Sequence, residues 1–258
     1  MDIKEVRANA KERMKGFCRV CPVCDGRACA GETPGMGGIG TGSAFKNNVA
    51  ALAGVRLNMR LIHEVKKPVT ETEVLGFRLR LPVLAAPIGG TSFNMGGALS
   101  EAEYARAIVS GCREAGIVGC VGDGAPDELH EAGNAAIAAE RAGCDGIVVS
   151  NHGGRALDHT PGTIEVLPAI AAQVKGRMAV LMDGGIRDGL DVLKALAFGA
   201  DAVLIGRPFC LAAVGGGSEG VKLTADHLYN QLVRSMVLTG CPSVREAGRH
   251  LVSTAHLA

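Results

Sequence analysis

A short unit recurs along the chain and restricts what it can fold into. Each copy has the end of an apolar helix pattern, then a glycine, a short apolar strand and a glycine-rich loop. The copies are EAGIVGCVGDG (114–124), RAGCDGIVVSNHGG (141–154), VKGRMAVLMDGGIR (174–187) and FGADAVLIGRP (198–208), and LPVLAAPIGG (81–90) is an earlier strand of the same type. Apolar strands that alternate with helices indicate βαβ units and a parallel sheet.

The same pattern predicts where the individual elements lie. We expect parallel strands at 82–86, 117–121, 146–149, 178–182 and 201–205. We expect helices at 100–115, 127–142, 163–175 and 188–198, and a closing helix at 219–240. Residues 1–80 combine a helix, a cysteine- and glycine-rich stretch and a hairpin in TEVLGFRLRLP. The expected division is therefore an N-terminal cap and hairpin at 1–80, followed by a β/α region at 81–258.

Composition narrows the class of protein. The chain has 258 residues, of which 47% are hydrophobic, so it can bury a sizeable core. Lys and Arg number 27 against 26 Asp and Glu, a balance that argues against a nucleic-acid or membrane-surface partner. No apolar run reaches the length of a transmembrane helix, and the N-terminal pattern is charged. Nine cysteines without a secretion signal predict reduced thiols and a cytoplasmic protein.

Polar residues gather just after the expected strands. The clusters are Gly89–Ser92, Gly122–Asp123, Ser150–Arg155, Asp183–Arg187 and Gly206–Arg207. The carboxyl ends of parallel strands meet at one edge of the sheet, and that edge is where sites form in α/β folds. The sequence therefore predicts a single site built from several loops.

The last two loops, LMDGGIRDG and LIGRPF, have the features of a phosphate site. Their glycines let backbone N–H groups approach a phosphate, and the following helix adds its positive N-terminal end. Arg187 and Arg207 can bind the phosphate oxygens directly. The alternative is that both loops are simply tight strand-to-helix turns.

These stretches together resemble the FMN-dependent α-hydroxy-acid oxidases and dehydrogenases of the glycolate oxidase and lactate dehydrogenase type, in particular a bacterial branch with a cysteine-rich N-terminus. The resemblance is carried by LPVLAAPIGG, IVVSNHGGRALDHTPGTIEVLP, VLMDGGIRDGLDVLKALAFGADAVLIGRPF and CPVCDGRACAG…PGMGGIGTGSAFKNN. It implies a (β/α)8 TIM barrel with FMN as cofactor, so that residues 81–258 would be the FMN-binding part.

The resemblance also implies roles for individual residues. Ala86, Pro87 and Ile88 would place backbone against the flavin ring. The other cofactor-binding residues would be Ser150, Asp183, Gly184, Gly185, Arg187, Gly206 and Arg207, with the two arginines at the ribityl phosphate.

The SNHGGR stretch would then supply the catalytic groups. His152 would be the base and Arg155 would bind the substrate carboxylate, while hydride passes to flavin N5. Imidazole suits proton transfer near neutral pH, and a guanidinium binds a carboxylate through two hydrogen bonds. Gly153 and Gly154 would leave room for substrate and flavin between the two side chains. The alternative is an ordinary loop histidine with satisfied hydrogen bonds.

Four cysteines near the N-terminus have a spacing that could bind metal. Cys18, Cys21, Cys24 and Cys29 form C-x2-C-x2-C-x4-C, which approaches the pattern of iron–sulfur or zinc sites. The last gap is longer than in ferredoxins, and Ala30 rather than proline follows Cys29. The alternative is a run of reduced thiols beside the mouth of the barrel.

The chain departs from the family at its centre. It runs from the helix pattern after the second strand directly into the pattern before the sixth, as if three βα units were missing between Ala139 and Glu140. The family's lysine beside flavin N1 and O2, the acidic partner of its histidine and its N-terminal tyrosine have no counterpart, although Phe17 and Cys18 lie near the tyrosine position. Five strands cannot close a barrel, so we expect an incomplete barrel with exposed edges.

Two functions remain open from the sequence. The first is FMN-dependent oxidation of a small 2-hydroxy acid to the 2-oxo acid, an activity that the three missing units could impair. The second is a non-catalytic remnant that still binds FMN or phosphate. The motif SNHGGR argues against a third reading, a flavin-dependent isomerase. The expected partners are a 2-hydroxy-acid substrate and a second copy of the chain.

Overall fold

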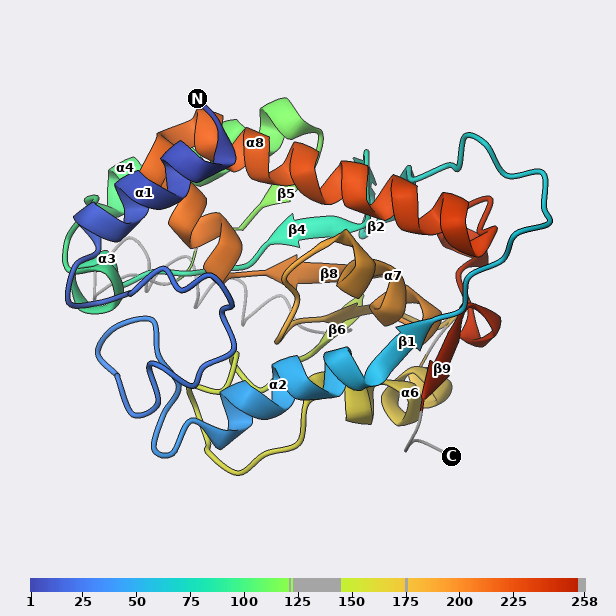
Figure 1. The fold of residues 1–258 in the computed structure, drawn as a ribbon, viewed down its shortest axis with the longest axis horizontal. Helices are drawn as coiled ribbons and strands as arrows, with labels where there is room; N and C mark the ends of the chain where they lie inside the picture. The colour runs from blue at the N-terminus through green and yellow to red at the C-terminus, as the bar shows by residue number, and fades with distance from the viewer. Residues whose placement is uncertain (121, 123–144, 175, 255–258) are drawn as a thin grey trace.

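A five-stranded parallel sheet forms the centre of the computed structural model, which describes residues 1–120, 122, 145–174 and 176–254 (Figure 1). The strands are β4 (Val83–Ala85), β5 (Val118–Gly119), β6 (Gly146–Val149), β7 (Ala179–Met182) and β8 (Ala202–Ile205). Each lies within the range predicted from the sequence. The short apolar runs between glycines were therefore sufficient to locate the strands.

The order of the strands identifies the sheet as the wall of a barrel. The order is β5-β4-β8-β7-β6, so the first of these strands pairs with the last, with Leu84 opposite Leu204. A last strand that returns to the first is the arrangement of a β/α barrel. In the described ranges β5 and β6 each pair with one neighbour, and the barrel is incomplete between them, as predicted.

Helices follow the strands much as the sequence predicts. They are α4 (Glu101–Ala115), α6 (Thr163–Val174) and α7 (Gly189–Ala197). Ser100 and Glu103 form a reciprocal capping box at the start of α4, and Gly116 ends it with a φ of +72°. The Asp188 carboxylate accepts two backbone N–H groups at the start of α7. The helix predicted at 127–142 lies outside the described residues.

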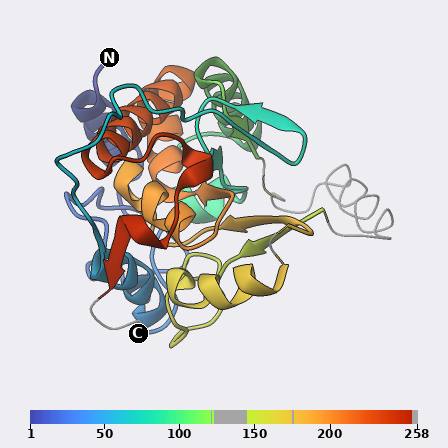
Figure 2. The same cartoon turned by 90° about the vertical axis from the view of Figure 1, so that its right-hand side faces the viewer.

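The closing helix begins earlier than predicted. It was expected at 219–240, but α8 extends over Arg207–Thr239. Pro208 lies in its first turn, where proline favours a helix start, and Gly217 interrupts the helix with a φ of +56°. The first part of the helix was not predicted because three consecutive glycines, 215–217, are unfavourable in a helix. α8 packs against α4, α7 and the N-terminal helix α1 (Ile3–Arg13), and Figure 2 shows α8 and α6 on opposite sides of the strands.

The predicted hairpin is confirmed. β2 (Thr72–Val74) and β3 (Phe77–Leu79) pair antiparallel across Leu75 and Gly76, both of which have positive φ. Val74 and Leu79 pack with Leu84, Leu181 and Leu204 in a small apolar cluster on one face of the sheet. The larger core lies between the sheet and the helices.

Several elements were not predicted from the sequence. They are α2 (Ser43–Gly54), the short α3 (Thr91–Met95), the antiparallel pair β1 (Val55–Leu57) and β9 (Val252–Thr254), and two 3-10 turns at Val244–Glu246 and Arg249–Leu251. α2 matters most for function. Its first half contacts the loops after β6 and β7. The segment before it, residues 14–42, contacts Arg187 and Arg207, and we call it the cysteine-rich segment.

Candidate active site

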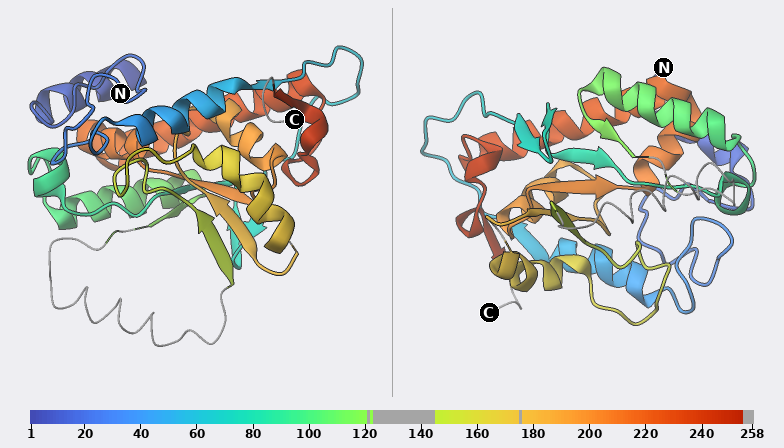
Figure 3. Two further views of the ribbon diagram at one scale, coloured as in Figure 1. Left: turned by 90° about the horizontal axis from the view of Figure 1, so that it is seen from below. Right: turned by 180° about the vertical axis from the view of Figure 1, so that it is seen from behind.

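The loops predicted to form the site do meet at one end of the sheet. Figure 3 shows the loop after β6 and the cysteine-rich segment side by side there. The Gly153 carbonyl accepts a hydrogen bond from Arg207 Nη1 at 3.1 Å, which joins the loop after β6 to the loop after β8. Of the predicted clusters, Asp123 lies outside the described residues.

Arg207 is a cation held by neutral groups. It donates to the carbonyl oxygens of Met36 (2.8 Å), Gly37 (3.2 Å) and Gly153 (3.1 Å). Its guanidinium lies 3.8 Å from the centroid of the Phe45 ring. Burial, together with the positive charge of Arg187, lowers the pKa of Arg207 to about 10. A guanidinium whose acceptors are only carbonyl dipoles is suited to bind an anion.

Arg187 has a hydrogen-bond donor to spare. Its Nε donates to the Cys24 carbonyl at 2.9 Å, and its Nη1 donates to the carbonyl of Ile186 at 2.9 Å. Its Nη2 is buried and has no hydrogen-bond partner among the residues that the structure describes. A buried donor without a partner is costly, and a phosphate oxygen would relieve that cost.

Arg155 turns toward the cysteine-rich segment and α3. It donates to the carbonyl oxygens of Gly35 (2.6 Å) and Gly37 (2.8 Å) and to Asn94 Oδ1 (2.8 Å). Burial lowers its pKa. Within the described ranges, no ion pair joins a carboxylate to Arg155, Arg187 or Arg207. The site is therefore a concentration of positive charge.

His152 lies on a left-handed turn at the carboxyl end of β6. Its φ is +57°, and Gly153 and Gly154 continue the turn with φ of +62° and +77°. Its backbone N–H donates to the Ser150 hydroxyl at 3.0 Å, and its side chain is exposed. Left-handed backbone is uncommon for a residue other than glycine, and it concentrates at functional sites.

The two glycines lie in close contact with neighbouring parts of the site. A Cβ on Gly154 would lie 2.3 Å from the backbone nitrogen of Phe45 in α2, and one on Gly153 would lie 2.9 Å from Arg207 Nη1. Glycine at these two positions therefore leaves room for α2 and Arg207, and the predicted room for substrate and flavin stays a prediction. Gly185 is similar, because a Cβ there would meet the carbonyl oxygen of Asn48 at 2.5 Å.

Asn48 of α2 joins two of the site loops and was missed in the sequence. Its side chain is 1% exposed and pairs reciprocally with Asn151, with Nδ2 to Oδ1 distances of 2.7 and 3.0 Å. Its Oδ1 also accepts the backbone N–H of Thr163, and a Cβ on Gly184 would lie 2.9 Å from its Nδ2. The loops after β6 and β7 are thus both fixed against α2. A buried amide on a helix carries no motif that would identify it.

Asp158 forms a second link between the loop after β6 and α2. Its carboxylate accepts hydrogen bonds from the backbone N–H groups of Thr41 (2.6 Å) and Ala44 (3.1 Å) and from the hydroxyls of Thr41 (2.7 Å) and Ser43 (2.7 Å). The hydroxyl of Ser43 is the largest cause that holds the pKa of Asp158 far below its usual range. The carboxylate caps the start of α2 from another part of the chain.

Asp183 follows β7 directly and carries a buried carboxylate. Within the described part of the chain, its Oδ1 is buried without a hydrogen-bond partner. Burial raises its pKa, and Ser150, His152 and Arg207 oppose the rise. Asp183 therefore lies close to three other residues that were predicted for the same site.

The segment 86–88 lies beside these loops. The Ala86 backbone N–H donates to the carbonyl of Ile205 at 2.9 Å, which extends the pairing of β4 with β8. Ile88 Cδ1 would lie 3.3 Å from a Cβ on Gly206. Ala86, Pro87 and Ile88 therefore follow the end of β4 at the same edge as Arg207.

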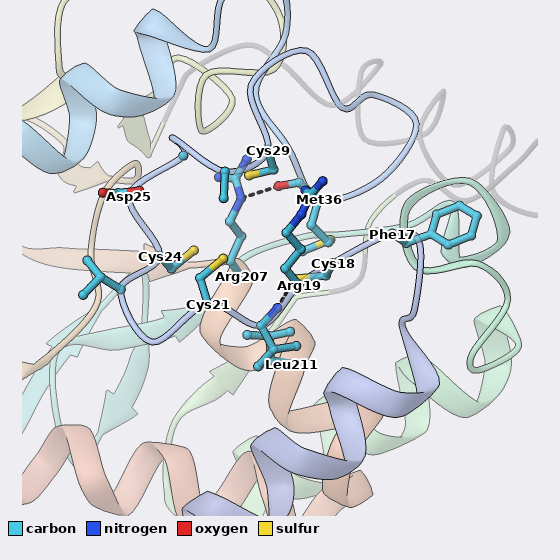
Figure 4. Close-up of a pocket in the computed structure, with 14 residues that line it drawn as sticks. Phe17, Cys18, Arg19, Cys21, Cys24, Asp25, Cys29, Met36, Arg207 and Leu211 are labelled. Carbon is cyan, nitrogen blue, oxygen red and sulfur yellow. Dashed lines mark hydrogen bonds between the residues drawn. The ribbon is translucent and has the colours of Figure 1, made fainter.

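The structure does not bring the four cysteines together as metal ligands in the residues that it describes. Cys18, Cys21, Cys24 and Cys29 line a cavity of about 30 Å³ together with Arg207 and Met36 (Figure 4). Among the described residues, however, no three His, Cys, Asp or Glu side chains come together as metal ligands. The prediction of an iron–sulfur cluster or zinc thus finds no support. Burial raises the pKa of Cys18 and Cys29, which opposes the thiolate form that metals bind.

Comparison with known proteins decides the family. The family described as FMN-dependent dehydrogenase matches this chain at residues 35–139 and again at 131–254. The chain belongs to this family. The two matched stretches meet in the part of the sequence where three βα units were predicted to be missing.

Curated relatives match part of the chain. A peroxisomal (S)-2-hydroxyacid oxidase of Arabidopsis thaliana is 51% identical over 119 residues, which are 46% of this chain and 33% of the relative. An L-lactate oxidase of Lacticaseibacillus rhamnosus is 53% identical over 119 residues, 46% of this chain and 32% of the relative. The matches thus span about a third of the length of these relatives.

Solved structures share the fold. A mandelate oxidase variant with 2-hydroxy-phenylacetamide has a TM-score of 0.74 at 25% identity, and mandelate oxidase with benzoyl-formic acid has a TM-score of 0.73 at 25% identity. Each alignment covers 98% of this chain and 98% of the other. The predicted TIM-barrel fold is confirmed, with an incomplete barrel. No helix in the described ranges is long and apolar enough to cross a membrane.

Proposed function

We propose that this chain binds FMN and oxidises a small 2-hydroxy acid to the corresponding 2-oxo acid. The observation that carries the proposal is the group formed by Arg155, Arg187 and Arg207 at the carboxyl end of the sheet. Their hydrogen bonds go to neutral acceptors, and Arg187 keeps a buried donor unpaired. FMN would bring a phosphate to such a site, and a 2-hydroxy acid would bring a carboxylate.

The residues present fit the FMN phosphate. Arg187 Nη2 has a free hydrogen to donate, and the backbone at Gly206 and at the start of α8 adds N–H groups where a helix N-terminus favours an anion. Ser150 and Asp183 lie near the same loops, and the backbone of 86–88 lines the edge beside them. FMN, when bound, would accept the two electrons of the oxidation.

His152 and Arg155 would act on the substrate. The exposed imidazole of His152 would accept the proton that the 2-hydroxy acid loses, a role to which imidazole side chains are suited. Arg155 would exchange a neutral acceptor, such as Asn94 Oδ1, for the substrate carboxylate. A bond between two charged groups is stronger than the bonds it replaces.

The similarity to hydroxy-acid oxidases supports the enzyme over the non-catalytic alternative. The three missing βα units lead us to expect a low level of activity. Without the family's lysine beside the flavin, and with part of the barrel wall absent, water would screen the charges that stabilise the reaction. We therefore expect weak FMN binding and slow turnover. The same open edges and the reduced cysteines lead us to propose a self-associating cytoplasmic protein.

The test begins with the cofactor. Purified protein is incubated with FMN, desalted and heated, and the released flavin is identified by chromatography; FAD as the bound species would contradict the proposal. Glycolate, lactate and mandelate are then added without oxygen while flavin absorbance is followed. We expect one of them to bleach the flavin, and His152→Ala to abolish bleaching but retain FMN. Equal loss of flavin from His152→Ala would instead make His152 a structural residue.

A further inference from the structure

The cysteines of the cysteine-rich segment are placed differently from most others in the chain. Cys18, Cys21, Cys24 and Cys29 are all partly exposed and line one cavity. Cys112, Cys210 and Cys241, by contrast, are buried. Figure 4 shows Cys21 and Cys24 pointing toward the same part of the cavity, with Arg207 beside them. A small oxidant could reach these two thiols from solvent.

The backbone of this segment also holds the site arginines. The Cys24 carbonyl accepts from Arg187 Nε, the Met36 carbonyl from Arg207 Nε, and the Gly35 carbonyl from Arg155 Nη1. Any change in the backbone at Cys24 therefore changes the hydrogen bond that orients Arg187. With Nε bonded to the Cys24 carbonyl and Nη1 to the Ile186 carbonyl, Nη2 has no partner in the described ranges and can donate to a phosphate.

We propose that Cys21 and Cys24 are a redox pair that a hydroperoxide oxidises to a disulfide, and that the disulfide weakens FMN binding by moving the Cys24 carbonyl away from Arg187. The two cysteines have the C-x2-C spacing of many dithiol pairs. The pair itself is independent of the proposed function, whereas its effect on FMN rests on it.

The chemistry balances with hydrogen peroxide as the oxidant. The Cys24 sulfur, as thiolate, attacks one peroxide oxygen; the O–O bond breaks, a sulfenic acid forms, and the other oxygen leaves as water after taking a proton. The Cys21 thiol then attacks the Cys24 sulfur, the S–S bond forms, and the sulfenic oxygen leaves as a second water. Two thiols lose two electrons and one peroxide gains them. Arg207 lines the same cavity as the two cysteines.

A disulfide would constrain the backbone next to Arg187. The two Cα atoms of a disulfide lie about 4.4–6.8 Å apart with a defined torsion, so a short loop must adopt the turn that allows it. In the reduced protein the Cys24 carbonyl is instead placed by its bond to Arg187 Nε. Loss of that orientation removes a preorganised phosphate donor, for which we expect about tenfold weaker FMN binding.

The experiment compares reduced and oxidised protein. The whole chain is reduced, treated with hydrogen peroxide and digested without reductant, and disulfides are mapped by mass spectrometry. FMN affinity is measured by quenching of FMN fluorescence before oxidation, after it and after dithiothreitol. Cys21→Ser and Cys24→Ser are the test variants. Cys241→Ser is the matched control, because its thiol is buried and serine can keep the hydrogen bond to the Ser243 carbonyl.

We expect a Cys21–Cys24 disulfide, a roughly tenfold loss of FMN affinity that dithiothreitol reverses, and no such loss in either test variant. The control should respond like the unaltered protein. A different pairing, or stoichiometric zinc or iron on these cysteines in the purified protein, would overturn the redox pair. A mapped disulfide without a change in FMN affinity would overturn the coupling. If the reduced protein binds no FMN at all, the coupling and the proposed function are both wrong. The mapped disulfides still show in that case whether Cys21 and Cys24 form a redox pair.

Discussion

Gly154 is the position where a single methyl group should most disturb the site. In Gly154→Ala the new Cβ would lie 2.3 Å from the backbone nitrogen of Phe45 and 2.7 Å from its Cα. Both are backbone atoms at the start of α2, so no side-chain rotation can relieve the clash. Either α2 or the His152 turn must move.

The expected cost has two parts. A side chain at a φ of +77° costs about 1–2 kcal/mol, and overpacking of this kind adds about 1–3 kcal/mol. The total of about 2–5 kcal/mol is below the stability of most domains, about 5–15 kcal/mol, so the variant should fold. We also expect it to lose FMN affinity, because the turn beside Arg207 shifts.

Gly176→Ala is the matched control. Gly176 has a φ of +85°, but a Cβ there would meet no atom within 4 Å. It therefore reports the cost of the backbone conformation alone, about 1–2 kcal/mol. Urea unfolding with linear extrapolation measures both variants. If Gly154→Ala and Gly176→Ala lose the same stability and the same FMN affinity, the close contact between the turn and α2 is not what fixes the site.

Three further predictions follow from the same geometry. Asn48→Ala should cost about 2–4 kcal/mol in urea unfolding, because Asn151 and the Thr163 N–H lose a buried partner; a neutral result would contradict the role of α2. Asp183→Asn should stabilise the flavin-free protein at pH 7, because burial raises the pKa of the carboxyl group and penalises its charged form. This gain in the free energy of unfolding should shrink as pH falls through the raised pKa toward about 3.9, the usual pKa of Asp. A gain that does not vary with pH would refute the prediction. Light scattering should show the mass rising with concentration, since β6 pairs with β7 alone in the described ranges and its Val148 is 44% exposed. A monomer at every concentration would exclude association through the edges.

The fold was largely predictable because it depends on local patterns. Short apolar runs between glycines located β4, β6, β7 and β8, and the spacing of the repeats indicated both the barrel and its missing part. α2 was not predicted because its sequence, SAFKNNVAALAG, follows a glycine-rich stretch and one of its polar residues faces inward. Asn48 is among its buried residues, which reverses the usual rule that polar positions face solvent.

The site was predictable in its members but not in its contacts. His152, Arg155, Arg187 and Arg207 were chosen by chemical type, and the structure brings their loops to one edge. Which atoms the arginines bind depends on carbonyl groups of the cysteine-rich segment more than 100 residues away. Backbone carbonyls carry no sequence signal, so no pattern could have shown that Gly35, Met36 and Gly37 hold these side chains.

The most direct test of the account compares the affinity of FMN with that of riboflavin, which lacks the phosphate. Fluorescence titration of the reduced protein should give FMN at least about tenfold tighter than riboflavin, equivalent to about 1.4 kcal/mol for the phosphate. The difference should largely disappear in Arg187→Met, which removes the buried unpaired donor but keeps similar bulk. Equal affinities for the two flavins, or an FMN preference that survives in Arg187→Met, would contradict the claim that these arginines form a phosphate site.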